Sequence, residues 1–213
     1  MTIVISKAFR GYRVPSRGQP SRERIVAGAA DLIRRRGLAG STIRDLAAHA
    51  GAPLGSTYHY FPRGKQQLAA EAVRFAGDAT ARVLRRSLLA GPSAGLGDFL
   101  AWWRQLVLDS DFTAGCPVLA VAVEEPPGGD AEAVTAAAEA FTAWEGVLAE
   151  ALRRDGVARD PAARLATLIV AAVEGAVALC RARRDIRPLD DVGTQLRALV
   201  DAAPRLAPDT AVS

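Results

Sequence analysis

The chain has 213 residues, half of them apolar, so it can bury a core in one or two domains without disulfides or metal ions. Its two cysteines, Cys116 and Cys180, lack the spacing of metal ligands and fit a reducing cytoplasm, although a disulfide between them stays open. Glu174 interrupts the longest apolar run before it reaches the roughly 18 residues of a membrane span, and the N-terminus has no secretory signal pattern. We therefore expect a soluble, alanine-rich helical protein of the cytoplasm, with no membrane segment.

Charge is divided unevenly along the chain. Residues 1–65 hold 12 basic and 3 acidic side chains, a net charge of +9, whereas the other 15 basic and 20 acidic side chains give −5. A basic head on an acidic body predicts a polyanionic partner for the head, although basic residues can also simply solubilise a small domain. Residues 1–20 mix basic side chains with Gly, Pro and Ser, which indicates a flexible arm that either follows DNA or has no role.

Three helices are predicted between residues 21 and 65. Thr42 and Asp45 have the spacing of a capping box at the start of the second helix, and Gly51 ends that helix. The third helix, about Leu54–Tyr60, follows a proline and is too short to bury much surface, so its polar side chains are suited to contact. A short helix, a glycine turn and a second short helix are typical of a helix-turn-helix, whose second helix lies in the major groove of DNA.

The rest of the chain is also predicted to be helical, so the fold class is all-α. A long helix begins at Lys65, runs to about Leu89, and joins the head to the body. Asp160 is predicted to cap a later helix, with Pro161 at its first position. Apolar residues at helical spacing place further helices at about 99–109, 130–154, 160–181 and 189–202.

The helix at 160–181 is apolar on nearly all sides in its middle, so more than one of its faces must be covered. One interpretation is an ordinary internal pair with the helix at 189–202. The other is a self-complementary dimer interface, in which the pair packs against its symmetry mate as a four-helix bundle.

The order TIRDLA, AGAPLGSTYHYF and PRGKQQL, within Ser21–Leu68, resembles the DNA-binding domain of the tetracycline-repressor (TetR) family of bacterial transcriptional regulators. GCPVLAVAVE, at Gly115–Glu124, resembles the regulatory domain of the LmrA/YxaF-like subgroup. The resemblance implies a basic arm at 1–20, a helix-turn-helix domain at 21–65, and a helical effector-binding and dimerisation domain at 66–213. It also implies a homodimer through the helices at 160–181 and 189–202, and a repressor that a small effector releases from a double-stranded operator.

The resemblance and the positions of the residues also predict the DNA contacts. Pro53 and Leu54 depart from the commoner family pattern, and Leu54 removes an expected polar contact, so the operator sequence cannot be taken from relatives. Thr42, Tyr60 and Lys65 are assigned to phosphates, and Arg44, Gly55, Ser56, Thr57, Tyr58 and His59 to the groove. Tyr58 and Tyr60 have an alternative role in packing within the head.

All three tryptophans lie in two neighbouring segments of the body. Aromatic side chains at helical spacing are commonly plain core, but the resemblance favours a cavity for an apolar or aromatic effector. Glu145 or Gln105 is expected to supply a polar contact, and Cys116 is expected to be buried and inert, with a redox trigger as the alternative. The predicted effector residues are Phe99, Trp102, Trp103, Gln105, Leu106, Phe112, Cys116, Phe141, Trp144, Glu145 and Leu148.

Two other functions compete with this interpretation. An enzyme would need a nucleophile with a base, or a metal site, but both histidines, His49 and His59, lie in the head. We therefore predict no catalytic residues, no metal site and no cofactor. A nonspecific architectural DNA binder would bind with little sequence preference, but it would have little need of a large acidic body.

Overall fold

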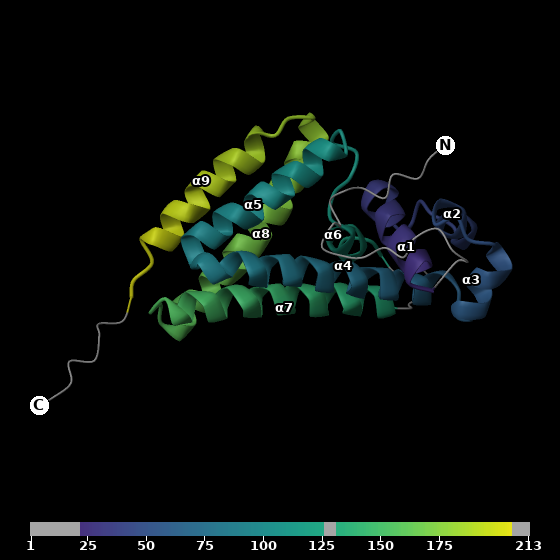
Figure 1. Ribbon diagram of the computed structural model, residues 1–213, viewed down its shortest axis with the longest axis horizontal. Coiled ribbons are helices and arrows are strands. Elements are labelled where there is room, and N and C mark those ends of the chain that lie inside the picture. The colour runs from purple at the N-terminus through teal and green to yellow at the C-terminus, as the bar shows by residue number, and fades with distance from the viewer. Residues whose placement is uncertain (1–21, 126–130, 206–213) are drawn as a thin grey trace, which may run out of the picture.

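The computed structural model describes residues 22–125 and 131–205, and within these ranges the regular secondary structure is helical, apart from one isolated β-bridge between Val157 and Arg205 (Figure 1). The prediction of an all-α fold is therefore confirmed. The predicted arm at 1–20 lies outside the described residues. In chain order the elements are α1 Arg22–Arg36, α2 Ile43–His49, α3 Leu54–Tyr60, α4 Lys65–Ser87, the short 3-10 helix η2 Leu88–Ala90, α5 Pro92–Asp109, α6 Pro117–Ala122, α7 Glu132–Arg154, α8 Arg159–Arg183 and α9 Arg187–Asp201.

The first three helices form the head, and their ends follow the local sequence. The predicted capping box is present: the Asp45 amide donates to the Thr42 hydroxyl at 3.1 Å, and the Thr42 amide donates to the Asp45 carboxylate at 2.8 Å. Gly51 takes a φ of +64° just beyond the end of α2, a conformation that favours glycine. Helices α1 and α2 approach so closely that a Cβ on Gly28 would lie 2.6 Å from the Cβ of Ala50. The sequence thus fixes the angle between α2 and the helix that supports it.

A buried ionic cluster adds to this attachment. Asp31 on α1 accepts from Arg34 Nε at 2.8 Å and from Arg35 Nε at 3.1 Å, and it lies 2.8 Å from His49 Nε2 on α2. Asp31 and Arg34 are both buried. Burial alone would raise the pKa of Asp31, but the hydrogen bonds and charges of His49, Arg34 and Arg35 hold it well below its usual value.

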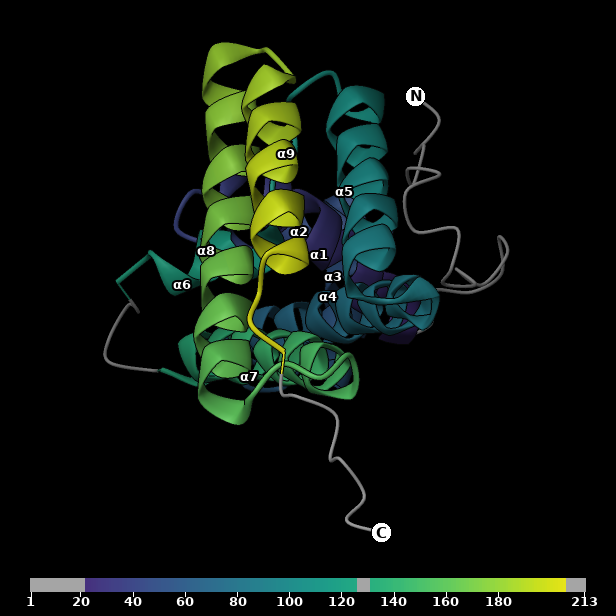
Figure 2. The same ribbon diagram turned by 90° about the vertical axis from the view of Figure 1, so that its left-hand side faces the viewer.

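The body is a set of helices around α4, which runs from the head into the body. Helices α4 and α7 lie side by side and run in the same direction, α5 and α8 pack against them, and α9 packs on α5 and α8 (Figures 1 and 2). Gly77 of α4 allows close packing, since a Cβ there would lie 2.7 Å from the Cβ of Ala140. The indole Nε1 of Trp144 donates to the Gly77 carbonyl at 2.9 Å. One long helix therefore belongs to both the head and the core of the body.

Helix α8 differs from its prediction at its start. It begins at Arg159 after Ala158, and the Ala162 amide donates to the Ala158 carbonyl at 2.9 Å. The prediction that Asp160 caps the helix and Pro161 opens it is therefore wrong by two residues. The physical reason is that proline is tolerated throughout the first turn, where amide groups have no intrahelical acceptor.

By length and composition α8 could also cross a membrane, with a mean hydropathy of 1.8 over an 18-residue window, of which 39% is buried inside the protein. The core helix of a soluble protein meets the same criteria, so this property alone is weak evidence for a membrane span. Helix α8 packs against α7, α9 and α5, and it keeps one exposed apolar face.

Candidate DNA interface and effector cavity

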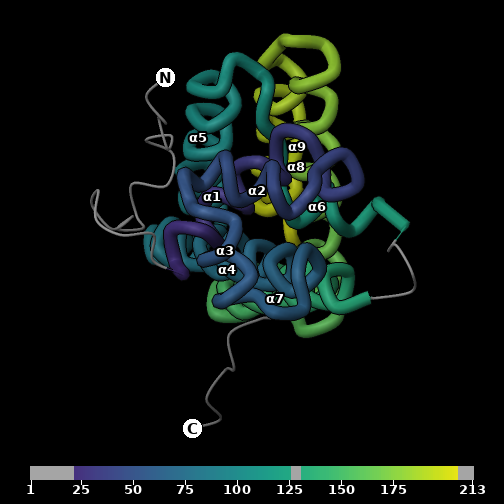
Figure 3. Tube along the Cα trace, turned by 90° about the vertical axis from the view of Figure 1, so that its right-hand side faces the viewer, coloured from purple at the N-terminus to yellow at the C-terminus, as the bar shows by residue number. Residues whose placement is uncertain are grey.

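Helices α2 and α3 lie at the end of the molecule furthest from α9 (Figures 1 and 3). Their side chains present a mixed polar and aromatic surface, in which Tyr58 is 48% exposed and Tyr60 is 37% exposed. This exposure argues against the alternative that both tyrosines pack within the head. Of the predicted DNA-contact residues, Thr42, Arg44, Gly55, Tyr58, His59 and Tyr60 are exposed, and Ser56 and Lys65 are half-buried.

Thr57 is the exception among the predicted groove residues. Its side chain is fully buried, and its hydroxyl donates to the Pro53 carbonyl at 3.1 Å, within its own helix. The structure therefore gives it no surface for contact with a base, because its position on α3 faces the head. Phe61, just after α3, is also fully buried, with the Arg22 guanidinium 5.5 Å from the centre of its ring. Phe61 therefore packs within the head.

Lys65 begins α4, as predicted, directly after Gly64 with a φ of +74°. The first amide groups of a helix lack intrahelical partners and attract anions, so Lys65 stands at a position suited to a phosphate. The neighbouring Arg63 pairs instead with Glu132 at the start of α7, at 2.7 Å. This ion pair joins the start of α4 to the start of α7 at the border between head and body.

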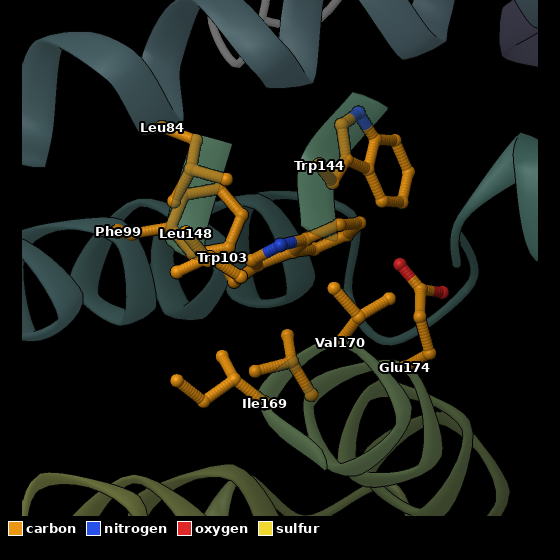
Figure 4. Close-up of a pocket in the computed structure, with 9 residues that line it drawn as sticks. Leu84, Phe99, Trp103, Trp144, Leu148, Ile169, Val170 and Glu174 are labelled. Carbon is orange, nitrogen blue, oxygen red and sulfur yellow. The ribbon is translucent and has the colours of Figure 1, made fainter. Parts of the chain in front are cut away.

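A small apolar cavity lies where four body helices meet (Figure 4). About 10 Å³ is open to the centres of water-sized spheres, which is room for about one water molecule. A drug-sized ligand could therefore enter only if the surrounding helices moved apart. The lining residues are Leu84 from α4, Phe99 and Trp103 from α5, Trp144 and Leu148 from α7, and Ile169, Val170, Val173 and Glu174 from α8.

The structure brings together some of the predicted effector residues and separates others. Phe99, Trp103, Trp144 and Leu148 line the cavity. Trp102 lies outside the lining and stacks on Phe99, with ring centroids 5.7 Å apart. Leu106, Phe112, Cys116 and Phe141 are buried or half-buried outside the lining.

The two predicted polar contacts do not reach the cavity. Gln105 is exposed, and its amide donates to the Asp109 carboxylate at 2.5 Å. Glu145 is half-buried and lies outside the lining of the cavity. Neither side chain can supply the polar contact that was expected of it in this conformation.

Glu174 on α8 is the polar group of the cavity, and the sequence prediction missed it. Its side chain is 5% exposed, and its Oε2 atom has no hydrogen-bond partner in the part of the chain that the structure describes. Burial raises the pKa of Glu174 to about 7, against a hydrogen bond with Cys116 that lowers it. Burial also raises the pKa of the Cys116 thiol, which supports the expectation of an inert cysteine. The signal in the sequence was the single carboxylate within an otherwise apolar helix.

Hydrogen bonds also join the body to the C-terminal end of α1. Arg181 on α8 donates from Nη1 to the Arg34 carbonyl at 3.2 Å and from Nη2 to the Arg35 carbonyl. The Gly115 amide donates to the Arg34 carbonyl at 2.9 Å. Helix α6 contributes as well, because the Glu124 carboxylate, just beyond its end, accepts from the amides of Leu38 at 2.9 Å and Ala39 at 2.6 Å. The head is therefore held to the body through α6 and α8 as well as through α4.

A helix-turn-helix with an exposed second helix, set on a larger helical body with its own cavity, defines a two-part DNA-binding protein. Comparisons with known proteins agree with this class. Residues 25–72 match the family model for bacterial regulatory proteins of the tetR family, and residues 92–195 match the C-terminal domain of LmrA/YxaF-like transcriptional regulators.

The chain is 42% identical over 186 residues to an uncharacterized HTH-type transcriptional regulator, MT0206, of Mycobacterium tuberculosis (strain CDC 1551 / Oshkosh), and this covers 85% of the chain and 95% of the relative. It is 31% identical to the HTH-type regulator YxaF of Bacillus subtilis (strain 168), over 87% of the chain and 97% of the relative. The fold is similar to that of a cysteine mutant of the TetR-family regulator CifR, which was solved in complex with 26bp double-strand operator DNA. The TM-score is 0.70 and the sequence identity is 21%, and the match covers 90% of this chain and 100% of that one.

The chain therefore belongs to the TetR family and is a DNA-binding transcriptional regulator. Both resemblances drawn from the sequence, to the family and to the LmrA/YxaF-like subgroup, are confirmed.

Proposed function

We propose that the protein is a repressor that binds a near-palindromic operator as a homodimer and leaves it when a small apolar or aromatic effector enters the body. Residues 21–65 would bind DNA and residues 66–213 would bind the effector and the second subunit, in the cytoplasm. The observation that carries the DNA part is the exposure of α3 beside Arg44 and Lys65. A helix this short offers few base contacts, each worth about 1–3 kcal/mol, so useful specificity needs two copies.

The homodimer is supported by an uncovered apolar face on α8 and α9. Leu168 and Leu179 on α8 are 47% and 42% exposed, and Leu199 on α9 is 47% exposed. Gly175 lies between the two leucines of α8, and nothing lies within 4 Å of the place where its Cβ would be, so another helix could pack closely there. Packing of α8 and α9 against the same pair in a second subunit would bury this face.

Two carboxylates on this face would break such a dimer. The double variant Leu168→Glu/Leu179→Glu is expected to sediment as a monomer in analytical ultracentrifugation, because it would bury charge in an apolar interface. The matched control is Leu89→Glu on η2, where the side chain is 83% exposed and far from α8 in the chain. A double variant that still sediments as a dimer would contradict an interface on this face.

Release of DNA by the effector is supported by α8, which both lines the cavity and contacts α1 of the head. Glu174 and Arg181 are seven residues apart on α8, so they lie on one face about two helical turns apart. A ligand that widens the cavity must displace one of its walls, and a displaced α8 moves the contact of Arg181 with α1. The ligand would shift the equilibrium toward a dimer whose two α3 helices no longer match successive grooves, about 34–36 Å apart or a multiple of this.

The experiment that tests the proposed function is selection of bound sequences from a random double-stranded DNA pool by the full-length protein. We expect enrichment of a near-palindrome with two half-sites, and loss of that enrichment with the dimer-breaking double variant. The Leu89→Glu control should enrich the same sequence as the unmodified protein. Binding at moderate salt with no enriched sequence would favour the nonspecific binder, and enrichment of a single asymmetric site would contradict a symmetric dimer.

A further inference from the structure

The cavity contains a carboxylate that folding has already removed from water without giving it a counter-ion. The Oε2 atom of Glu174 has no partner among the described residues, and its lining neighbours are aromatic or aliphatic. It has a hydrogen bond with the Cys116 thiol, which carries no positive charge. A buried acid in such surroundings is stabilised most by a group that brings a positive charge.

The aromatic rings beside Glu174 favour the same kind of group. Figure 4 shows the carboxyl group of Glu174 directed toward the end of the cavity where Trp103 and Trp144 lie. The faces of indole rings attract cations, and they do so more strongly when the cation is removed from water. An anionic ligand would meet the carboxylate and the negative faces of the rings together.

We propose that the effector is a cationic amine with an apolar, ring-containing body, and that its ammonium group pairs with Glu174 while its body displaces the walls formed by Trp103 and Trp144. This inference rests on the proposed effector role of the cavity. The protein has already met the cost of removing Glu174 from water when it folds, so the ligand adds only the cost of removing its own charge. Trp103 Nε1, which is also buried and has no hydrogen-bond partner within residues 22–125 and 131–205, offers a donor to an acceptor elsewhere on the ligand.

The proton balance of binding follows from the same geometry. An amine with a pKa near that of lysine, about 10.4, stays protonated near neutral pH, and its approach favours the ionised carboxylate. Any proton held by Glu174 in the free protein therefore leaves to the solvent on binding. Cys116 is the titratable group that contacts Glu174, and its raised pKa keeps it protonated in this range. The affinity for the amine should then rise between pH 6 and 8, whereas the affinity for a neutral analogue should not.

The test compares three ligands of the same shape on the full-length protein: 2-(2-naphthyl)ethylamine, 2-(2-naphthyl)ethanol and 2-naphthylacetate. Calorimetry gives the affinities, and displacement from the selected operator gives the effect on DNA. We expect the amine to bind about tenfold more tightly than the alcohol, the difference between a charged and a neutral hydrogen bond, and the carboxylate to bind least. The amine should also displace the operator at the lowest concentration.

The variant Glu174→Gln should bind the alcohol as before but lose the preference for the amine, together with its rise in affinity with pH. The matched control is Glu145→Gln, which removes a half-buried carboxylate of α7 that lies outside the cavity, and it should keep both. Equal or weaker binding of the amine than of the alcohol would overturn the inference while leaving the effector role intact. Failure of all three ligands to bind would overturn the inference and the effector part of the proposed function together. Tight binding of the amine without release of DNA would overturn the effector part, and with it the inference that the amine is the effector.

Discussion

Two buried carboxylates show how differently the head and the body are built. Asp31 in the head has three positively charged or hydrogen-bonding partners within 3.1 Å, and its pKa lies well below the usual value. Glu174 in the body has one oxygen without a partner, and burial raises its pKa to about 7. The same chemical group is satisfied where the protein must keep a fixed shape and left unsatisfied where the proposed effector would bind.

This difference in the pairing of the two carboxylates matters because the proposed binding of an operator requires a rigid head. Helix α2 must hold α3 at a fixed angle if two copies of α3 are to match one operator. The pairing of Asp31 with groups from α1 and α2 suits that requirement, since a fully paired network specifies one arrangement. An incompletely paired carboxylate between movable helices leaves free energy that a ligand can recover.

The largest expected effect is the removal of Asp31. Asp31→Ala should lower the free energy of unfolding by about 3–5 kcal/mol, because Arg34 would remain buried without its carboxylate. Denaturant unfolding of the full chain measures this, with Asp78→Ala at an exposed position of α4 as the control. A loss of stability no greater than that of the control would mean that the head does not depend on this cluster.

The second-largest expected effect is a gain in the free energy of unfolding, and it depends on pH. The folded pKa of Glu174, about 7, lies above the ordinary value of 4.5 for a glutamate, so the wild-type protein loses stability as the pH rises between these values, and the loss stays complete above pH 7. Glu174→Gln lacks that loss. The variant should therefore be more stable than the wild type by about 3 kcal/mol at pH 8, and by little at pH 4.5.

Denaturant unfolding at the two pH values tests this, and Glu145→Gln should show no such dependence. If Glu174→Gln gains no stability at pH 8, then burial of the Glu174 carboxylate does not destabilise the protein, and the contrast with Asp31 fails. The gain would also explain why a cationic ligand, which supplies the missing charge, should stabilise the wild type more than the variant.

The third effect separates two adjacent residues of α3. Tyr58→Ala should weaken binding to the selected operator by about 1–3 kcal/mol, the range for one good base contact, without changing the free energy of unfolding much, because Tyr58 is 48% exposed. Thr57→Val keeps the shape of a fully buried side chain and should leave operator affinity unchanged. Operator titrations of both variants measure this, and the reverse order of effects would restore Thr57 as a DNA contact.

The sequence predicted the head better than the cavity for a physical reason. The ends of α2 and α3 depend on local signals, such as the Thr42–Asp45 capping box and Gly51, and the structure contains them where they were predicted. The lining of the cavity depends instead on how four helices rotate against one another. Helical spacing placed Trp102 and Trp103 in one group, although only Trp103 lines the cavity. Glu174 was visible as an interruption of an apolar run, but its partners were not.

The smallest expected effect concerns the contact that joins the two regions. Arg181→Ala removes the guanidinium that donates to the Arg34 and Arg35 carbonyls, and so it removes one of the attachments of α1 to the body. If α8 carries the response of the cavity to the head, this variant should bind the amine with unchanged affinity but reduce its effect on operator affinity by about 0.5–2 kcal/mol. Arg164→Ala, at an exposed position of the same helix, is the matched control and should respond like the wild type. An unchanged response in Arg181→Ala would assign the transmission to α4 and α6. The Glu124 carboxylate, just beyond α6, accepts from the amides of Leu38 and Ala39, which follow α1.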